Sequence, residues 1–101
     1  MGEHTRLTAA NMRVGSWAYM APERFSDRDI TPAADIYSLA CVLYEALTGQ
    51  LPFPAESQGG FVAAHLSSPP PRPSLTNPRV PAALDDVITR GMAKEPDDRY
   101  G

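Results

Sequence analysis

The chain has 101 residues, of which 43% are hydrophobic and 21% are charged, and its net charge is −3. This composition is typical of a folded globular protein and excludes an intrinsically disordered chain. The mild acidity and the lack of a basic cluster exclude a nucleic-acid-binding protein. A single cysteine, Cys41, cannot form an internal disulfide or a cysteine-rich metal site, so we expect a buried, inert thiol.

No apolar stretch of the sequence approaches the roughly 20 residues that a membrane-spanning helix needs. The first residues match neither a signal peptide nor a myristoylation pattern. We therefore expect a cytoplasmic chain, and a membrane anchor elsewhere in a longer parent protein stays open.

The N-terminal quarter of the chain predicts a loop. Residues 1–13 are polar and show little apolar periodicity. Residues 14–25 contain Gly15, Pro22 and three aromatic side chains, a pattern too irregular for a strand or a long helix. A loop so rich in aromatic residues is usually docked on other structure, so we expect residues 1–25 to include an ordered segment.

Residues 31–48 give the strongest helix signal. Thr31 is a suitable N-cap, Pro32 fits the first helical position, and Gly49 stops the helix. Apolar or aromatic side chains occupy nearly every face of this segment: Ile36, Tyr37, Leu39, Val42, Leu43, Tyr44 and Leu47. A helix that is apolar all round is a buried helix, which predicts a central core helix. A chain of 101 residues cannot easily surround such a helix, so we expect further structure around it.

Three segments follow this helix. Residues 60–67 predict a short helix, residues 68–80 a proline-rich connector, and residues 81–94 an amphipathic helix. The apolar stripe of the last segment repeats at helical spacing and packs on one side only: Leu84, Val87, Ile88 and Met92. The fold class predicted is mainly α, with three to four helices.

Four motifs follow one another along the sequence. Residues 15–23, GSWAYMAPE, match the end of the activation segment in the large helical lobe of Ser/Thr protein kinases, G-[TS]-x-x-Y-M-A-P-E. Residues 35–40, DIYSLA, resemble the start of the F helix of the family, and residues 47–53, LTGQLPF, its L-x-G-x-x-P-F. Residues 92–100, MAKEPDDRY, are similar to the segment before the last kinase helix. The chain thus resembles a fragment of a bacterial receptor-type kinase, with a long ordered activation segment as part of a partial C-terminal lobe.

The resemblance implies structural roles for three charged residues. Glu23 is expected to pair with Arg99, and the alternative is two unrelated surface charges. Asp35 is expected to accept hydrogen bonds from the backbone of a catalytic loop, or only to compensate the dipole at a helix N-terminus. One departure from the family is Ala40, which stands where the F helix usually has glycine, and which the helix tolerates if the packing has room.

The resemblance also implies substrate-docking and phosphorylation sites. Ser16 occupies the position that contacts the catalytic Asp and helps to select a Ser or Thr substrate, although it is also a normal turn residue. Trp17 and Tyr19 would shape the surface that receives the residue after the phosphoacceptor, or serve only in packing. Thr8, and after it Thr5, are candidate activating phosphosites, with ordinary solvated loop threonines as the alternative.

The catalytic groups of a kinase are missing from these 101 residues. The sequence has no Gly-rich loop, no H-R-D and no D-F-G, which together bind ATP and Mg²⁺ and transfer phosphate. We expect no catalytic residue and no cofactor in this chain, with ATP and Mg²⁺ bound in the parent kinase. His4 and His65 are expected at the surface or in loops, without a metal site.

Two functions from different classes stay open on the sequence. The first is a kinase fragment that carries the substrate-docking and activation-segment half of protein phosphorylation and is inactive alone. Its partners would be the protein substrate and the missing kinase lobe or another kinase. The second is a non-catalytic protein-interaction module, in which residues 69–73 could bind an aromatic groove as a polyproline helix, or be the connector that the family often has here.

Overall fold

The computed structural model of the chain describes residues 17–26 and 28–100. This part of the chain is mainly helical and contains no strand, which confirms the predicted fold class. Its elements are η1 (Trp17–Tyr19), η2 (Pro22–Phe25), α2 (Ala33–Thr48), α3 (Gln58–Ser67), α4 (Pro73–Thr76), α5 (Ala83–Gly91) and η3 (Pro96–Asp98). None of its helices is long and apolar enough to cross a membrane.

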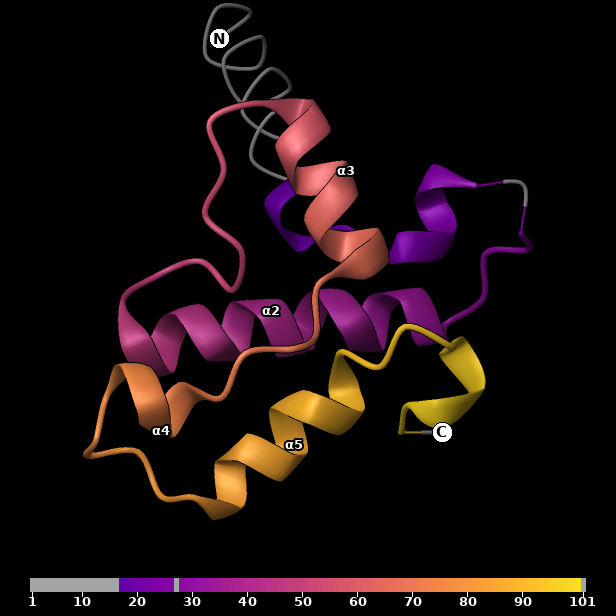
Figure 1. The fold of residues 1–101 in the computed structure, drawn as a ribbon. Helices are drawn as coiled ribbons and strands as arrows, with labels where there is room; N and C mark the ends of the chain where they lie inside the picture. Colours follow the sequence, from indigo (N-terminus) through magenta and orange to yellow (C-terminus); the bar gives the residue numbers. More distant parts are fainter. Residues whose placement is uncertain (1–16, 27, 101) are drawn as a thin grey trace, which may run out of the picture.

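Helix α2 runs through the middle of the fold, with α3 on one side and α4 and α5 on the other (Figure 1). The short 3₁₀ segment η1 packs on α2, while α3 packs on η1 and η2. Helix α2 begins two residues after the predicted start, and the Thr31 hydroxyl accepts a hydrogen bond from the Ala33 N–H at 3.3 Å. Gly49 ends the helix in the left-handed conformation, with φ 75°, where glycine is the favoured residue.

The core lies on the faces of α2 that these elements cover. Its buried members are Ala21, Ala34, Tyr37, Ala40, Cys41, Tyr44, Phe53, Ile88 and Met92. The prediction of a helix buried on nearly every face was wrong for two residues, because Leu39 is 64% and Val42 49% exposed. Nothing in residues 17–26 and 28–100 covers that side of α2. The sequence pattern correctly marked an apolar face, but it could not say which structure covers it.

The other helices differ from their predicted bounds for local reasons. Helix α3 begins at Gln58, not residue 60, because the Ser57 side chain caps it by accepting a hydrogen bond from the Gly60 N–H at 3.1 Å. The connector 68–80 contains the single turn of α4. Helix α5 ends at Gly91, three residues before the predicted end, because Met92 leaves the helical conformation at φ −101° and ψ 20°.

A close contact between two small residues sets the crossing of α2 and α5. A Cβ atom added to Gly91 would lie 2.7 Å from the Cβ of Ala40, which is closer than real Cβ atoms approach. Ala40, which stands where the family usually has glycine, therefore fits because position 91 lacks a side chain. The room that the Ala40 substitution needs is thus provided by the facing helix.

We expect Gly91→Ala to lower the free energy of unfolding by about 1–3 kcal/mol, because its methyl group overpacks the contact with Ala40. The double variant Ala40→Gly/Gly91→Ala should recover most of that loss, less the cost of about 1 kcal/mol for a glycine inside a helix. Urea unfolding measures both. Gly59→Ala is the matched control, since a Cβ there has only the Ser57 hydroxyl at 4.0 Å. Equal stability of Gly91→Ala and Gly59→Ala would contradict the account.

Candidate functional site

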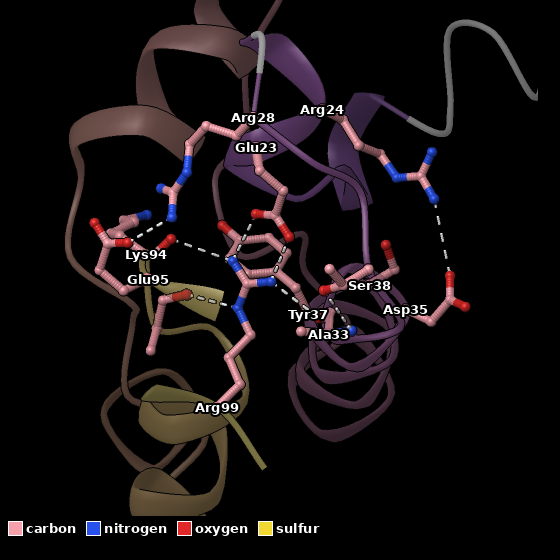
Figure 2. Close-up of polar contacts among 12 residues, drawn as sticks. Glu23, Arg24, Arg28, Ala33, Asp35, Tyr37, Ser38, Lys94, Glu95 and Arg99 are labelled. Atoms are coloured by element: carbon pink, nitrogen blue, oxygen red, sulfur yellow. Dashed lines mark hydrogen bonds and ion pairs between the residues drawn. The ribbon is translucent and has the colours of Figure 1, made fainter. Parts of the chain in front are cut away.

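A buried ion pair joins the start of the described chain to its end. Arg99 donates from Nη1 to Glu23 Oε2 at 2.7 Å and from Nη2 to Glu23 Oε1 at 2.8 Å, and both side chains are fully buried (Figure 2). Glu23 lies in η2 and Arg99 follows η3, 76 residues later. The pairing expected between these two residues is therefore present, in bidentate geometry.

The remaining donors of Arg99 bind backbone carbonyl groups. Its guanidinium donates to the carbonyl oxygens of Ala33, Ala93 and Lys94, at 2.9, 2.8 and 3.3 Å. The same group lies 4.9 Å from the centre of the Tyr37 ring. A buried charge is tolerated only when it is paired and fully hydrogen-bonded, and Arg99 meets this condition. Arg99 thereby joins η2, α2 and the segment after α5.

The charge of Glu23 follows from this arrangement. Burial raises the pKa of Glu23, but the hydrogen bonds and positive charge of Arg99 outweigh burial and hold that pKa below its ordinary value. The carboxylate therefore stays ionised at neutral pH, as the bidentate pair requires.

Asp35, in contrast, is a surface residue in this structure. It lies in the first turn of α2, its side chain is 85% exposed, and its carboxylate lies 3.9 Å from the Arg24 guanidinium. Figure 2 shows this contact well apart from the Glu23–Arg99 pair. The negative charge of Asp35 in the first turn of α2 interacts favourably with the dipole at the N-terminus of the helix. The hydrogen bonds that the resemblance implies for Asp35 involve a catalytic loop that the sequence does not contain, and they stay a prediction.

The segment η1 is held to α2 by polar side chains. Ser38 donates to the Tyr19 carbonyl oxygen at 2.6 Å, and the Tyr19 hydroxyl donates to the Glu45 carboxylate. That hydrogen bond is the main reason why the pKa of Tyr19 is raised to about 12. Trp17 packs on Phe25, with the ring centres 5.3 Å apart. Two of the predicted docking residues, Trp17 and Tyr19, thus lie on one short segment with a fixed backbone.

His65 is buried, so the expectation that it lies at the surface was wrong. Its side chain is 0% exposed, with Nδ1 2.7 Å from the Tyr37 hydroxyl and Nε2 3.0 Å from the Ala18 carbonyl oxygen. The rings of Phe25, Phe53 and Tyr37 surround it. Burial is the first cause that lowers the pKa of His65, to about 4, so the imidazole is neutral at pH 7. A lone histidine in the sequence gives no sign of such an environment.

A cavity of about 490 Å³ opens beside η1. Its wall is formed by residues of η1, α2, α3 and the loop between the last two: Ala18, Tyr19, Glu45, Leu51, Ala55, Glu56, Ser57, Gln58 and Phe61. Two of these residues, Glu45 and Glu56, are acidic.

Some of the predictions concern residues that the structure does not describe. Ser16, Thr8 and Thr5 lie outside the described residues. Within the described ranges, no group of three or more His, Cys, Asp or Glu side chains could hold a metal ion. The thiol of Cys41 is buried, and burial raises its pKa to about 12, as expected of an inert cysteine.

Three further residues of the site were missed on the sequence. Ser38 is a polar residue in the middle of an apolar helix, and that contrast could have marked it as a hydrogen-bond donor to a packed segment. Glu45 interrupts the same helix two turns later, so an acceptor could have been proposed there as well. Lys94 is the last residue of the helix predicted over 81–94, but in the structure it follows α5, and its Nζ lies 4.9 Å from the centre of the Phe53 ring and 3.5 Å from the Ala64 carbonyl oxygen.

The comparisons with known proteins agree with this architecture. The family model of the protein kinase domain matches residues 2–101. The chain is 55% identical over 95 residues to the serine/threonine-protein kinase PknH of Mycobacterium tuberculosis, covering 94% of this chain and 15% of that protein. It is 54% identical to PknD and 52% identical to PknE of the same species, covering 14% and 17% of those proteins.

The fold is a mainly helical lobe in which a buried Glu–Arg pair lies behind the ordered A-P-E segment, residues 21–23. The chain belongs to the protein kinase family, and it spans about a sixth of the length of the curated relatives that it matches. The resemblance drawn from the sequence is thereby confirmed.

We expect Glu23→Ala to lower the free energy of unfolding by about 3–5 kcal/mol, because it leaves the Arg99 guanidinium buried without a counter-charge. Chemical denaturation followed by Trp17 fluorescence measures the loss. Glu95→Ala is the matched control, since the Arg28–Glu95 pair has a similar length, 2.7 Å, but its side chains are 49% and 61% exposed. The control should cost less than about 1 kcal/mol. Similar losses of unfolding free energy in both variants would mean that the buried pair contributes no more to stability than the exposed Arg28–Glu95 pair.

The lowered pKa of His65 leads us to expect that the stability of the fold depends on pH. The unfolded chain binds a proton at His65 below its ordinary pKa of 6.5, whereas the folded chain resists protonation until about pH 4. The stability that His65 contributes is therefore complete above pH 6.5 and is lost as the pH falls toward 4. Unfolding midpoints between pH 7 and pH 5 should fall in the wild type and change less in His65→Gln. A slope unchanged in His65→Gln would show that His65 titrates normally.

Proposed function

We propose that this chain carries the substrate-docking half of a Ser/Thr protein kinase, an enzyme that transfers phosphate from ATP to serine or threonine in proteins. The observation that supports this most is the fixed backbone of η1. Its Ala18 and Tyr19 carbonyl oxygens each accept a hydrogen bond from a side chain of the helical core, beside the 490 Å³ cavity. A pre-formed groove of this kind can position an extended substrate at low entropic cost.

The peptide in this proposal lies along η1. Trp17 and Tyr19 contact the residue that follows the phosphoacceptor, and Ser16 selects serine or threonine, as the resemblance implies. The carboxylates of Glu45 and Glu56 favour a lysine or arginine side chain elsewhere in the peptide. Phosphorylation of Thr8 or Thr5 belongs to the same proposal, as a modification that orders the activation segment through a basic side chain.

The chain by itself does not transfer phosphate in this proposal. Its 101 residues contain none of the motifs that bind the nucleotide, and the described residues offer no metal-binding cluster. ATP and Mg²⁺ are bound by other parts of a complete kinase, which acts where ATP is present, in the cytoplasm or at the cytoplasmic face of a membrane.

We further propose that the exposed apolar face of α2 is where those other parts pack. Leu39 and Val42 are 64% and 49% exposed on the central helix, where an isolated apolar surface is costly. A pocket with almost no polar surface continues this face between α2 and α5, lined by Ile36, Leu39, Ala40, Leu43, Val87, Gly91 and Tyr100. The occupant that suits an apolar face of a kinase lobe is the half of a kinase domain that contains the catalytic loop.

The alternative of an independent interaction module finds less support. A polyproline ligand must present its prolines to a partner. Pro73 is buried and begins α4, while Pro70 and Pro71 are partly buried. The segment therefore resembles an ordered connector more than a free polyproline helix.

Peptide binding tests the proposal. Trp17 is the only tryptophan of the chain, so its fluorescence reports on η1 directly. A serine peptide with two lysines should change this signal in a saturable way, and a peptide with glutamates in place of the lysines should bind more weakly. Glu45→Gln should weaken the lysine peptide about 5-fold, because an ion pair is lost at a partly exposed site. Asp86→Asn, on the exposed side of α5, is the control and should leave the affinity unchanged.

Two results would contradict the proposal. If neither peptide binds to a cooperatively folded chain, η1 is not a docking segment. If Glu45→Gln and Asp86→Asn weaken the lysine peptide equally, the cavity does not select the cation and only the net charge of the chain attracts the peptide.

A further inference from the structure

The imidazole of His65 lies in a directed chain of hydrogen bonds. A carbonyl oxygen can only accept, so the contact between Nε2 and the Ala18 carbonyl requires a proton on Nε2. In a neutral imidazole Nδ1 is then an acceptor, and the Tyr37 hydroxyl donates to it at 2.7 Å. The sequence of bonds runs from α2 through α3 to η1.

The surroundings of His65 hold this arrangement in place. The ring centres of Phe53 and Tyr37 lie 5.2 and 5.5 Å from that of His65, both edge-on, and the Phe25 ring stacks at 6.4 Å. Tyr37 and His65 are both 0% exposed. Among the described residues, no buried side-chain nitrogen or oxygen lacks a hydrogen-bond partner, and both ring nitrogens of His65 are bonded. The imidazole is therefore fixed in one tautomer and one orientation.

We propose that His65 is a positioning residue: it fixes the backbone of η1 at Ala18 and thereby sets the surface that Trp17 and Tyr19 offer to a protein substrate. This inference rests on the proposed function of η1. His65 cannot touch the substrate, because it is fully buried. His65 binds the Ala18 carbonyl group of η1. Ser38 binds the next one, because its hydroxyl donates to the Tyr19 carbonyl oxygen at 2.6 Å. Two helices, α2 and α3, thus hold two consecutive peptide groups.

The tautomer is tested first, in the unmodified chain. Nitrogen-15 NMR of the histidine side chains should show His65 as a neutral ring with its proton on Nε2 throughout pH 5.5–7.5. A proton on Nδ1, or a titration near the ordinary pKa, would overturn the proposal, whether or not the chain binds a peptide.

The effect on η1 is tested with matched variants. His65→Leu removes both hydrogen bonds, and Tyr37→Phe removes only the donor to Nδ1. Tyr44→Phe is the control, because it removes a buried hydroxyl of the same helix that bonds Thr76 at 2.7 Å, on the α4 side. His65→Gln is the conservative variant, since its amide has a donor for the Ala18 carbonyl and an acceptor for the Tyr37 hydroxyl.

Hydrogen exchange at the Met20 amide, which bonds to the Trp17 carbonyl, and Trp17 emission report on η1. Well below the unfolding transition, His65→Leu should speed this exchange about 5- to 10-fold, the effect of losing one buried hydrogen bond, and shift the emission. Tyr37→Phe should have a smaller effect in the same direction, His65→Gln should recover most of the wild-type behaviour, and Tyr44→Phe should change neither signal. If His65→Leu fails to fold, the comparison of Tyr37→Phe with Tyr44→Phe decides the question.

Peptide affinity separates this inference from the proposed function. If the wild type binds the lysine peptide and His65→Leu or Tyr37→Phe weakens it, while Tyr44→Phe does not, both hold. If the wild type binds no peptide but η1 loosens in these variants alone, the proposed function fails and His65 still positions η1. If η1 is unchanged in His65→Leu and Tyr37→Phe, or equally changed in Tyr44→Phe, the positioning role is overturned.

Discussion

The buried pair of Glu23 and Arg99 is the interaction on which the rest of the structure depends. Its two members come from opposite ends of the described chain and are fully buried, with bidentate contacts of 2.7 and 2.8 Å. Because burying an unpaired charge is costly, the fold can close only when η2 and the segment after η3 meet. Arg99 also lies over the Tyr37 ring, at 4.9 Å from its centre, and thereby places the residue that bonds His65. Tyr37 thus contacts both Arg99 of the buried pair and His65, which binds the backbone of η1.

This arrangement explains how a short 3₁₀ segment, η1, is held in a fixed position. The backbone of η1 has few hydrogen bonds of its own, so its position depends on side chains from α2 and α3. Ser38, His65 and Glu45 supply them, each at a different residue or atom of η1. The carboxylate of Glu45 both orients Tyr19 and gives the neighbouring cavity its negative charge. The orientation of η1 and the preference for a cationic peptide that we propose then depend on the same contacts.

The sequence predicted the helical class, the central helix, the kinase family and the residues that form the buried pair, because long apolar periodicity and extended motifs are local signals. It did not predict the burial of His65, since a lone histidine carries no sign of the tyrosine and carbonyl that meet it from 28 and 47 residues away. It overestimated the burial of Leu39 and Val42, because a pattern shows that a face is apolar and not what covers it. The match between Ala40 and Gly91 also needed the structure, since it depends on where two helices cross.

The measurement that tests the account most directly is thermal unfolding of the purified chain, followed by Trp17 fluorescence, with and without magnesium and ATP. The account predicts one cooperative transition, because the buried pair and Tyr37 join all the elements, and a midpoint that the nucleotide leaves unchanged. A midpoint that rises with magnesium and ATP would contradict it, since only a ligand bound by the folded state stabilises the chain in this way. A broad transition without cooperativity would also contradict it, because η1 would then not be held in place by the 101 residues alone.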